Sequence, residues 1–168
     1  MNTTVHISVG VVVERHKAQS VWTDYIWQPV KVLAGAPEVE PWTLLEESAD
    51  AASFYAGGTS IELFPVDAGF YHDNLATDEP LLWVVLRSAK GAWPYELFKV
   101  TADPHEGVAL TEAGNDLIET VPMPDVIAAE IAAFVARHPV DRSFVKRQRN
   151  RANPEALARR IPRGEGKS

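Results

Sequence analysis

Residues 81–101 read LLWVVLRSAKGAWPYELFKVT, and this stretch decides the fold class. Its first six residues are an unbroken apolar run, which predicts a strand buried on both faces with Trp83 in the core. Residues 89–94 predict a turn. Residues 95–101 alternate in type and predict a further strand. Because a short turn joins two strands antiparallel, the stretch favours an antiparallel sheet over a doubly wound one.

Other short apolar segments, separated by turn residues, are typical of further strands. They are residues 5–13, 26–33, 54–66 and 117–121. Pro29 predicts that its strand lies at a sheet edge or carries a bulge. Gly57 and Gly58 predict a turn that would make residues 54–66 a hairpin. Residues 42–45 are apolar but favour neither strand nor helix.

The clearest helix is predicted at residues 124–138, where prolines mark both ends. Its apolar stripe at helical spacing consists of Ile127, Ile131, Phe134 and Val135. Shorter helices are predicted at residues 68–75 and 105–113, the second stopped by Gly114. The sequence therefore predicts an α+β fold: a mostly antiparallel sheet of about six strands, two or three helices, and a basic C-terminal arm.

Charge is divided unevenly along the chain. Residues 1–136 hold six Lys and Arg against twenty Asp and Glu, a formal charge of −14, and residues 137–168 hold ten against three, a formal +7. Such asymmetry indicates an interaction tail. We expect an acidic α+β domain at residues 1–140 and a partly disordered basic arm at residues 141–168.

The arm is the best candidate for a binding site. Its candidate partner-binding residues are Lys146, Arg147, Arg149, Arg151, Arg159 and Arg160. A solvated tail, a site for an acidic protein surface and a nucleic-acid site are the alternatives. The acidic body argues against nucleic acid, because phosphate would repel the body while it attracts the arm. We therefore expect an acidic protein partner.

Composition limits the chemistry available to the chain. The absence of cysteine excludes disulfides, cysteine-ligated metals and thiol catalysis. The five histidines are scattered without the spacing of a metal site, and Gly-x-Ser-x-Gly is missing. We therefore predict no catalytic residue, no metal and no cofactor. With no secretory signal and no apolar run longer than six residues, we expect a cytoplasmic protein without a membrane span.

Two features allow a functional and a structural interpretation. Residues 57–60, Gly-Gly-Thr-Ser, could present backbone N–H groups to an anion, but they lack the lysine of a phosphate-binding loop and resemble a hairpin turn. Trp22 and Trp27 flank Asp24 and Tyr25 at the mouth of a predicted hairpin, and Trp42 follows Pro41 in a loop. Such tryptophans are either lids over the core, the reading we favour, or anchors at a binding surface.

An ordered series of short blocks resembles one known family. The blocks are VGVVVER (9–15), WQPV (27–30), PWTLL (41–45), VVLR (84–87), VPMP (121–124), FVARH (134–138) and FVKR (144–147). They are similar to a proteobacterial family of unknown function whose members lie in formate dehydrogenase gene clusters. Some members are labelled molybdopterin-guanine dinucleotide biosynthesis protein A. The resemblance covers about residues 5–151.

The resemblance implies a role near a molybdopterin-dependent formate dehydrogenase. The biosynthesis label implies a nucleotidyltransferase, which needs a Gly-rich loop with a lysine near the N-terminus. Residues 10–15, GVVVER, contain a single glycine and no such loop. We therefore predict a non-catalytic accessory or assembly protein for the dehydrogenase. The alternatives are a nucleotide- or molybdopterin-binding enzyme of cofactor biosynthesis and a nucleic-acid-binding module.

Overall fold

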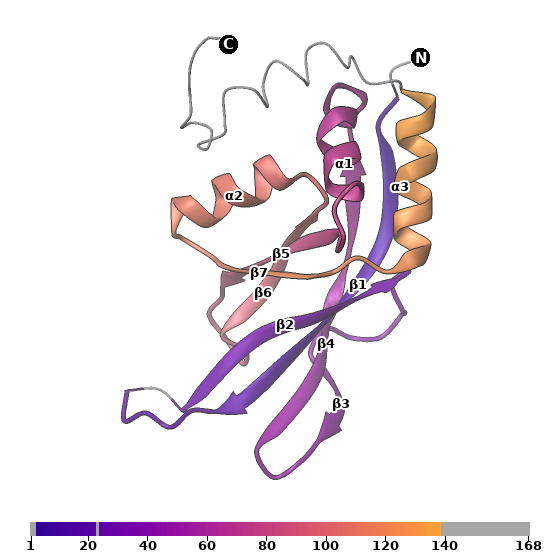
Figure 1. Ribbon diagram of the computed structural model, residues 1–168. Helices are drawn as coiled ribbons and strands as arrows, with labels where there is room; N and C mark the ends of the chain where they lie inside the picture. The colour runs from indigo at the N-terminus through magenta and orange to yellow at the C-terminus, as the bar shows by residue number, and fades with distance from the viewer. Residues whose placement is uncertain (1–2, 23, 139–168) are drawn as a thin grey trace, which may run out of the picture.

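The described part of the chain folds into two antiparallel sheets and three α-helices, as the α+β prediction expects (Figure 1). The computed structural model describes residues 3–22 and 24–138. Seven strands lie in this part of the chain, against about six predicted. The additional strand is β3 (Thr43–Glu47), in the apolar segment whose type the sequence did not indicate.

The larger sheet has the strand order β2-β1-β4-β3. Its other members are β1 (Val5–Lys17), β2 (Tyr25–Ala34) and β4 (Ala51–Leu63). β1 lies centrally, and its alternate residues Ile7, Val9, Val11 and Val13 are buried, because successive side chains of a strand point to opposite faces. β-Branched side chains suit such a position.

Pro29 lies where the sequence places it. β2 is an edge strand of this sheet, and Pro29 pairs with Val13 at an irregularity in the register between β1 and β2. Proline lacks the N–H that a central strand needs, so an edge or a bulge accommodates it.

The predicted hairpin at residues 54–66 is wrong. The segment is a single strand, β4, which pairs with β1 from Val5 to His16 and is interrupted only by a shift in register beside Gly57. Gly57 has φ of +139°, a conformation that glycine adopts at little cost. The two glycines therefore bend a strand instead of reversing it.

The smaller sheet has the order β6-β5-β7, formed by β5 (Leu81–Ser88), β6 (Tyr95–Thr101) and β7 (Leu117–Pro122). β5 and β6 pair antiparallel, as predicted from residues 81–101. Leu82, Val84 and Leu86 face the core. Trp83 lies outside it, which corrects the prediction: the ring is partly exposed and packs under Gly107 on the other face of β5.

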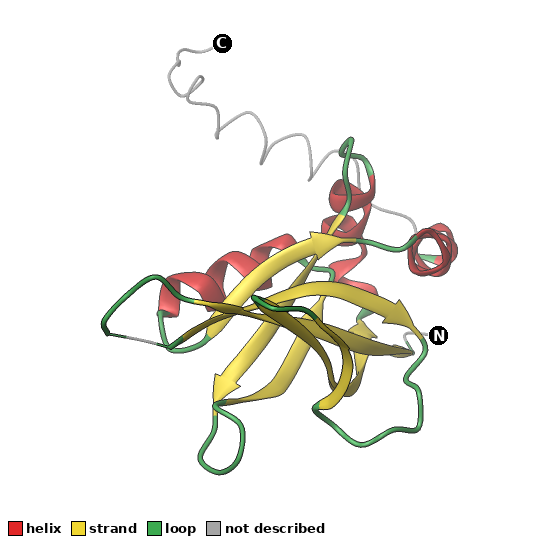
Figure 2. Ribbon diagram, turned by 90° about the horizontal axis from the view of Figure 1, so that it is seen from below, coloured by secondary structure: helices red, strands yellow, loops and turns green. Residues whose placement is uncertain are grey.

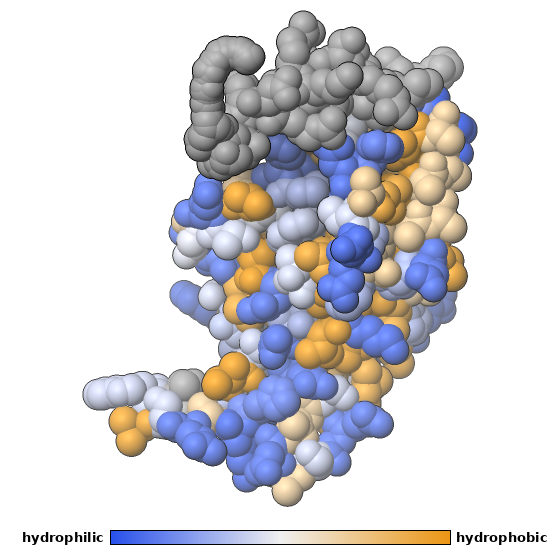
Figure 3. Space-filling model, viewed as in Figure 1, coloured by the Kyte–Doolittle hydropathy of each residue, from blue (hydrophilic) through white to orange (hydrophobic). Residues whose placement is uncertain are grey.

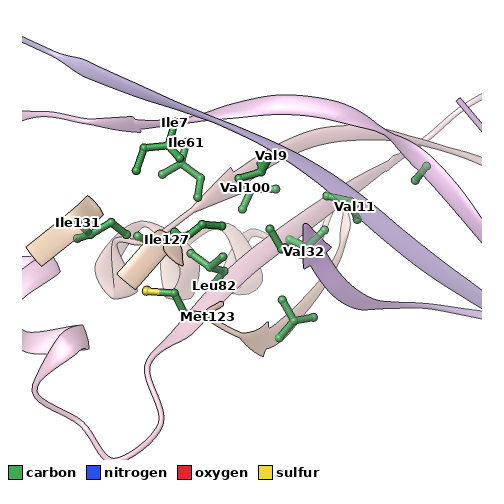
Figure 4. Close-up of a cluster of buried hydrophobic side chains, with 14 of the residues drawn as sticks. Ile7, Val9, Val11, Val32, Ile61, Leu82, Val100, Met123, Ile127 and Ile131 are labelled. Carbon is green, nitrogen blue, oxygen red and sulfur yellow. The ribbon is translucent and has the colours of Figure 1, made fainter. Parts of the chain in front are cut away.

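The two sheets meet along both sides, because β4 lies beside β6 and β2 beside β7. Six strands thus surround one core, and β3 extends the larger sheet beyond it. Figure 2 shows these strands crossing in two layers, with the helices gathered to one side. The core joins side chains from β1, β2, β4, β5, β6 and β7 to those of the C-terminal helix (Figure 4).

The three α-helices of the described residues are α1 (Ala68–Leu75), α2 (Pro104–Ala113) and α3 (Asp125–Arg137), and a 3-10 turn at Pro65–Asp67 precedes α1. The predicted helix at residues 124–138 is confirmed, and Ile127, Ile131 and Phe134 are fully buried. α2 ends at Gly114, which has φ of +75°, as a C-terminal glycine should. Within the described residues, no helix has the length and apolarity to cross a bilayer.

Candidate partner-binding surface

Aromatic side chains close the end of the core from which β3 and the β1–β2 hairpin extend. This aromatic lid consists of Trp27, Trp42, Phe54, Trp93 and Tyr95. Phe54 and Trp93 have ring centroids 5.0 Å apart, and Trp27 meets Trp42 edge to face at 5.8 Å. The rings of the lid come from β2, β4, β6 and two loops, so the lid joins the two sheets to each other at this end of the core.

Trp42 is fixed in the lid by its backbone. Its N–H donates to the carbonyl of Tyr55, and the hydroxyl of the next residue, Thr43, donates to the Glu40 carbonyl at 2.7 Å. Trp42 has φ of +68°, which is strained for a bulky side chain. Its ring is 8% exposed, so burial of the indole offsets the strain.

Arg15 extends the inward face of β1 beyond the last core valine and reaches the lid. Its guanidinium carbon lies 4.5 Å from the ring centroid of Tyr25 and 5.1 Å from that of Phe54. A guanidinium over aromatic faces is held by cation–π attraction. Arg15 therefore covers the rim of the lid.

Trp22 is placed differently from Trp27 and Trp42. It lies at the tip of the β1–β2 hairpin, where Val21 and Trp22 are each 90% exposed, and Ile26 on β2 is 54% exposed. The hairpin projects from the body at lower left in Figure 3. The lid interpretation thus fits Trp27 and Trp42, and the anchor interpretation fits Trp22.

An acidic pocket lies close to this hairpin, on the face of the larger sheet opposite the aromatic lid. It has a volume of about 430 Å³, and Glu14, Glu46 and Glu47 line it. Glu14 and Glu46 both oppose Ser53 of β4, from β1 and β3 respectively, so the carboxylates flank one strand. His16 contacts Glu14 at 2.8 Å. The pocket is therefore suited to a cationic side chain.

A second pocket, the β4–β6 cleft, lies where β4 approaches β6. It has a volume of about 470 Å³, and its polar lining includes His6, Thr59, Glu62, Lys99, Thr101 and Glu106. Lys99 and Glu106 form an ion pair at 2.7 Å, and Thr101 donates to the other oxygen of Glu106 at 2.6 Å. Lys99 is thus already neutralised, and the cleft offers little positive charge to a phosphate.

Carboxylates cluster beside this cleft. Burial raises the pKa of Asp67, and the negative charges of Asp103 and Glu106 raise it further. Burial also raises the pKa of the Tyr71 hydroxyl to about 12. Asp103 has a structural task, because its carboxylate accepts the N–H of His105 at the start of α2. The cluster contains no arrangement that activates a nucleophile.

Each histidine has a local partner. Three contact carboxylates and two lie against aromatic rings: His6 with Glu62, His16 with Glu14, His72 with Asp73, His105 with Phe70, and His138 with Phe134. Residues 3–22 and 24–138 contain no group of three His, Asp or Glu side chains able to hold a metal ion. The histidines serve local packing and surface pairing.

The Gly57–Ser60 stretch lies within β4 and pairs with β1. A Cβ at Gly58 would come within 2.6 Å of the Ala36 Cβ and 3.0 Å of the Tyr55 hydroxyl. The Tyr55 hydroxyl in turn donates to the Pro37 carbonyl at 3.2 Å. The loop after β2 therefore packs closely on this part of β4, and glycine is needed for that approach.

A family model described as "Protein of unknown function (DUF3305)" matches residues 8–148, most of the chain. The chain belongs to this family. No curated protein and no solved structure matches it significantly. The family match includes the β1–β2 hairpin, β3 and the start of the basic arm.

The predicted partner-binding residues lie outside the described residues. They are Lys146, Arg147, Arg149, Arg151, Arg159 and Arg160. The family match ends at residue 148, so Lys146 and Arg147 fall within it and the other four arginines beyond it. The sequence left open whether Trp22 is a lid or an anchor, and it did not indicate the acidic pocket, because both depend on how the strands are aligned.

Proposed function

We propose that this member of the family is a non-catalytic accessory protein that binds another protein through its hairpin tip and its basic arm. The observation that carries the proposal is the exposure of Val21 and Trp22, 90% each, on a hairpin that projects from the body. Tryptophan, with tyrosine and arginine, is enriched among the residues that dominate binding energy at protein interfaces. Its exposure on a projecting tip leaves that apolar area available for a partner.

The basic arm supplies the second half of the proposed surface. Lys146, Arg147, Arg149, Arg151, Arg159 and Arg160 would meet an acidic patch of the partner. Charge of this kind raises association rates and orients the encounter, whereas the apolar tip contributes desolvation. In this proposal residues 1–140 form the domain and residues 141–168 the arm.

The resemblance seen in the sequence supports a particular partner. Members of a similar family lie in formate dehydrogenase gene clusters, so we propose a molybdopterin-dependent formate dehydrogenase, or a protein that matures it, as the partner. In this proposal the protein acts in the cytoplasm. The family match alone supports membership and not this role.

The alternative of a nucleotide- or molybdopterin-binding enzyme has one supporting observation, the volume of the β4–β6 cleft. The charges there oppose it. A phosphorylated ligand in the cleft would face the negative charges of Glu62 and Glu106. The positive charge of Lys99 is already paired with Glu106. Nucleic-acid binding is opposed by the formal charge of −14 on residues 1–136.

The proposal is tested by capture of partners on the tagged full-length protein, with and without nuclease. We expect formate dehydrogenase subunits to be retained after nuclease treatment and lost from a variant in which the six arm cations are replaced by Gln. Retention of nucleic acid alone, with every protein released by nuclease, would contradict the proposal and favour the nucleic-acid module.

A further inference from the structure

β3 leaves one edge of the larger sheet open. It is the last strand in the order β2-β1-β4-β3, and among the described residues only β4 pairs with it. An open edge presents backbone N–H and C=O groups that can accept an added strand. Edge strands are commonly protected by charged side chains, especially lysine, or by proline. β3, with the sequence TLLEE, has no lysine or proline, and its only charges are the two glutamates.

The side chains of β3 divide into an apolar half and an acidic half. Leu44 and Leu45 are each 49% exposed. Leu44 pairs with Phe54 and Glu46 with Ser53, so Leu45 is left at a bulge without a partner on β4. Glu46 and Glu47 then line the acidic pocket with Glu14. An occupant of this edge must therefore offer apolar residues followed by cations.

The chain itself contains such a segment. Residues 143–147 read SFVKR, and residues 43–47 read TLLEE. Aligned in parallel, the two place Phe144 and Val145 beside the leucines, and Lys146 and Arg147 beside the glutamates. The reverse orientation would set the cations against the leucines. Complementarity of both apolar area and charge therefore holds in one orientation only.

The segment is too short to reach β3 of its own chain. Five residues beyond His138 span about 17 Å when fully extended. α3 alone is about 20 Å long. Figure 1 shows β3 beyond the Asp125 end of α3, whereas the described chain ends next to the Arg137 end. The segment must therefore come from another molecule.

We propose that residues 143–147 of one copy add to β3 of a second copy as a parallel strand, so that two copies exchange arms in a dimer. Each copy supplies one edge and one segment, which closes the assembly. The acidic pocket then receives the Lys146 and Arg147 side chains. Because these cations also belong to the proposed partner-binding surface, dimer formation and partner binding compete for them.

The oligomeric state of the full-length protein tests this proposal by sedimentation velocity between about 1 and 100 µM, a range suited to weak interfaces. We expect a concentration-dependent dimer that dissociates as salt rises, since exposed charges are screened over about 8 Å at physiological ionic strength. A monomer throughout this range at low salt would overturn the proposal.

Charge reversal locates the interface. Glu46→Lys/Glu47→Lys, and separately Lys146→Glu/Arg147→Glu, should each raise the dimer dissociation constant by about tenfold or more. The matched controls are Glu112→Lys/Glu130→Lys, on exposed helix surfaces, and Arg159→Glu/Arg160→Glu, on the distal arm. Controls that weaken the dimer as strongly would show a general charge effect and refute the site.

A mixture of the two interface variants gives the sharpest result. In a heterodimer, the reversed edge meets the reversed segment, and the native edge meets the native segment. Both contacts are then complementary, so two variants that are monomeric alone should associate one to one. Failure of the mixture to associate, with both variants folded by circular dichroism, would overturn the exchange. Capture of formate dehydrogenase by Glu46→Lys/Glu47→Lys, whose arm is intact, tests the proposed function separately.

Discussion

Trp42 and Trp93 stack with ring centroids 5.5 Å apart and planes 16° from parallel. Trp42 follows the loop after β2, and Trp93 stands in the loop between β5 and β6. The stacked pair therefore joins the larger sheet to the smaller one at the end of the core where the hairpin and β3 project. Stability at this end depends on rings supplied from both sheets.

Trp42→Ala should lower the free energy of unfolding by about 3–5 kcal/mol, because it removes a buried ring from its three aromatic neighbours, Trp27, Phe54 and Trp93. Trp22→Ala is the matched control, since Trp22 is a loop tryptophan that is 90% exposed. It should change stability by no more than about 0.5 kcal/mol. Urea unfolding measures both, and equal effects would contradict the distinction between lid and tip.

Gly107→Ala should destabilise the protein, although replacing glycine by alanine in a helix interior normally stabilises the helix by about 1 kcal/mol. A Cβ at Gly107 would lie 2.3 Å from the Cγ of Trp83. Overpacking of this kind costs about 1–3 kcal/mol. In the Trp83→Ala background the clash is gone, so the same substitution should become neutral or stabilising. An unchanged effect in both backgrounds would contradict the contact.

Much of the fold follows from local sequence. The continuous apolarity of residues 81–86 and the stripe on α3 each determine an element by themselves, and both elements form as predicted. Gly57 and Gly58 misled the prediction because glycine marks turns and bulges alike, and only the pairing of β4 with β1 separates the two. The prediction for Trp83 was wrong because both faces of β5 are covered: one face packs in the core, and the other, which carries Trp83, packs against α2.

Asn74→Ala should destabilise the protein by about 2–4 kcal/mol, because it leaves buried backbone groups without partners. The Asn74 amide donates to the carbonyls of Leu81 and Ala102 at 2.8 and 3.0 Å and accepts the N–H of Leu81 at 3.1 Å. It thus ties α1 to the start of β5. Asn115→Ala, which removes an amide at an exposed site, is the control. A similar loss of stability in both variants would refute this role of Asn74.

Asp67→Asn should stabilise the protein at neutral pH but not at acidic pH. Burial and nearby carboxylates raise the pKa of Asp67 above 3.8, so the folded state binds its proton more tightly than the unfolded state. The wild type therefore loses stability as the pH rises from 3.8 through the raised pKa. Thermal melting at about pH 3 and pH 7 measures the difference. A variant less stable than wild type at pH 7 would contradict the sign.

The binding surface was less accessible from sequence than the fold. Trp22 and Trp27 lie five residues apart and have similar sequence neighbours, yet Trp22 is exposed at the hairpin tip and Trp27 packs in the lid. The difference arises because Trp27 pairs with Arg15 across the hairpin, whereas Trp22 lies beyond the last pair, Lys17 with Tyr25. Strand register decides this, and no local pattern reports it.

The most direct test of the proposed function is a binding titration of the full-length protein with a purified molybdopterin-dependent formate dehydrogenase. We predict saturable binding that weakens by about tenfold or more in Trp22→Ala, as for a buried anchor worth at least 1.4 kcal/mol, with the stability of the variant unchanged. No binding by the wild type, or equal binding by wild type and Trp22→Ala, would contradict the account.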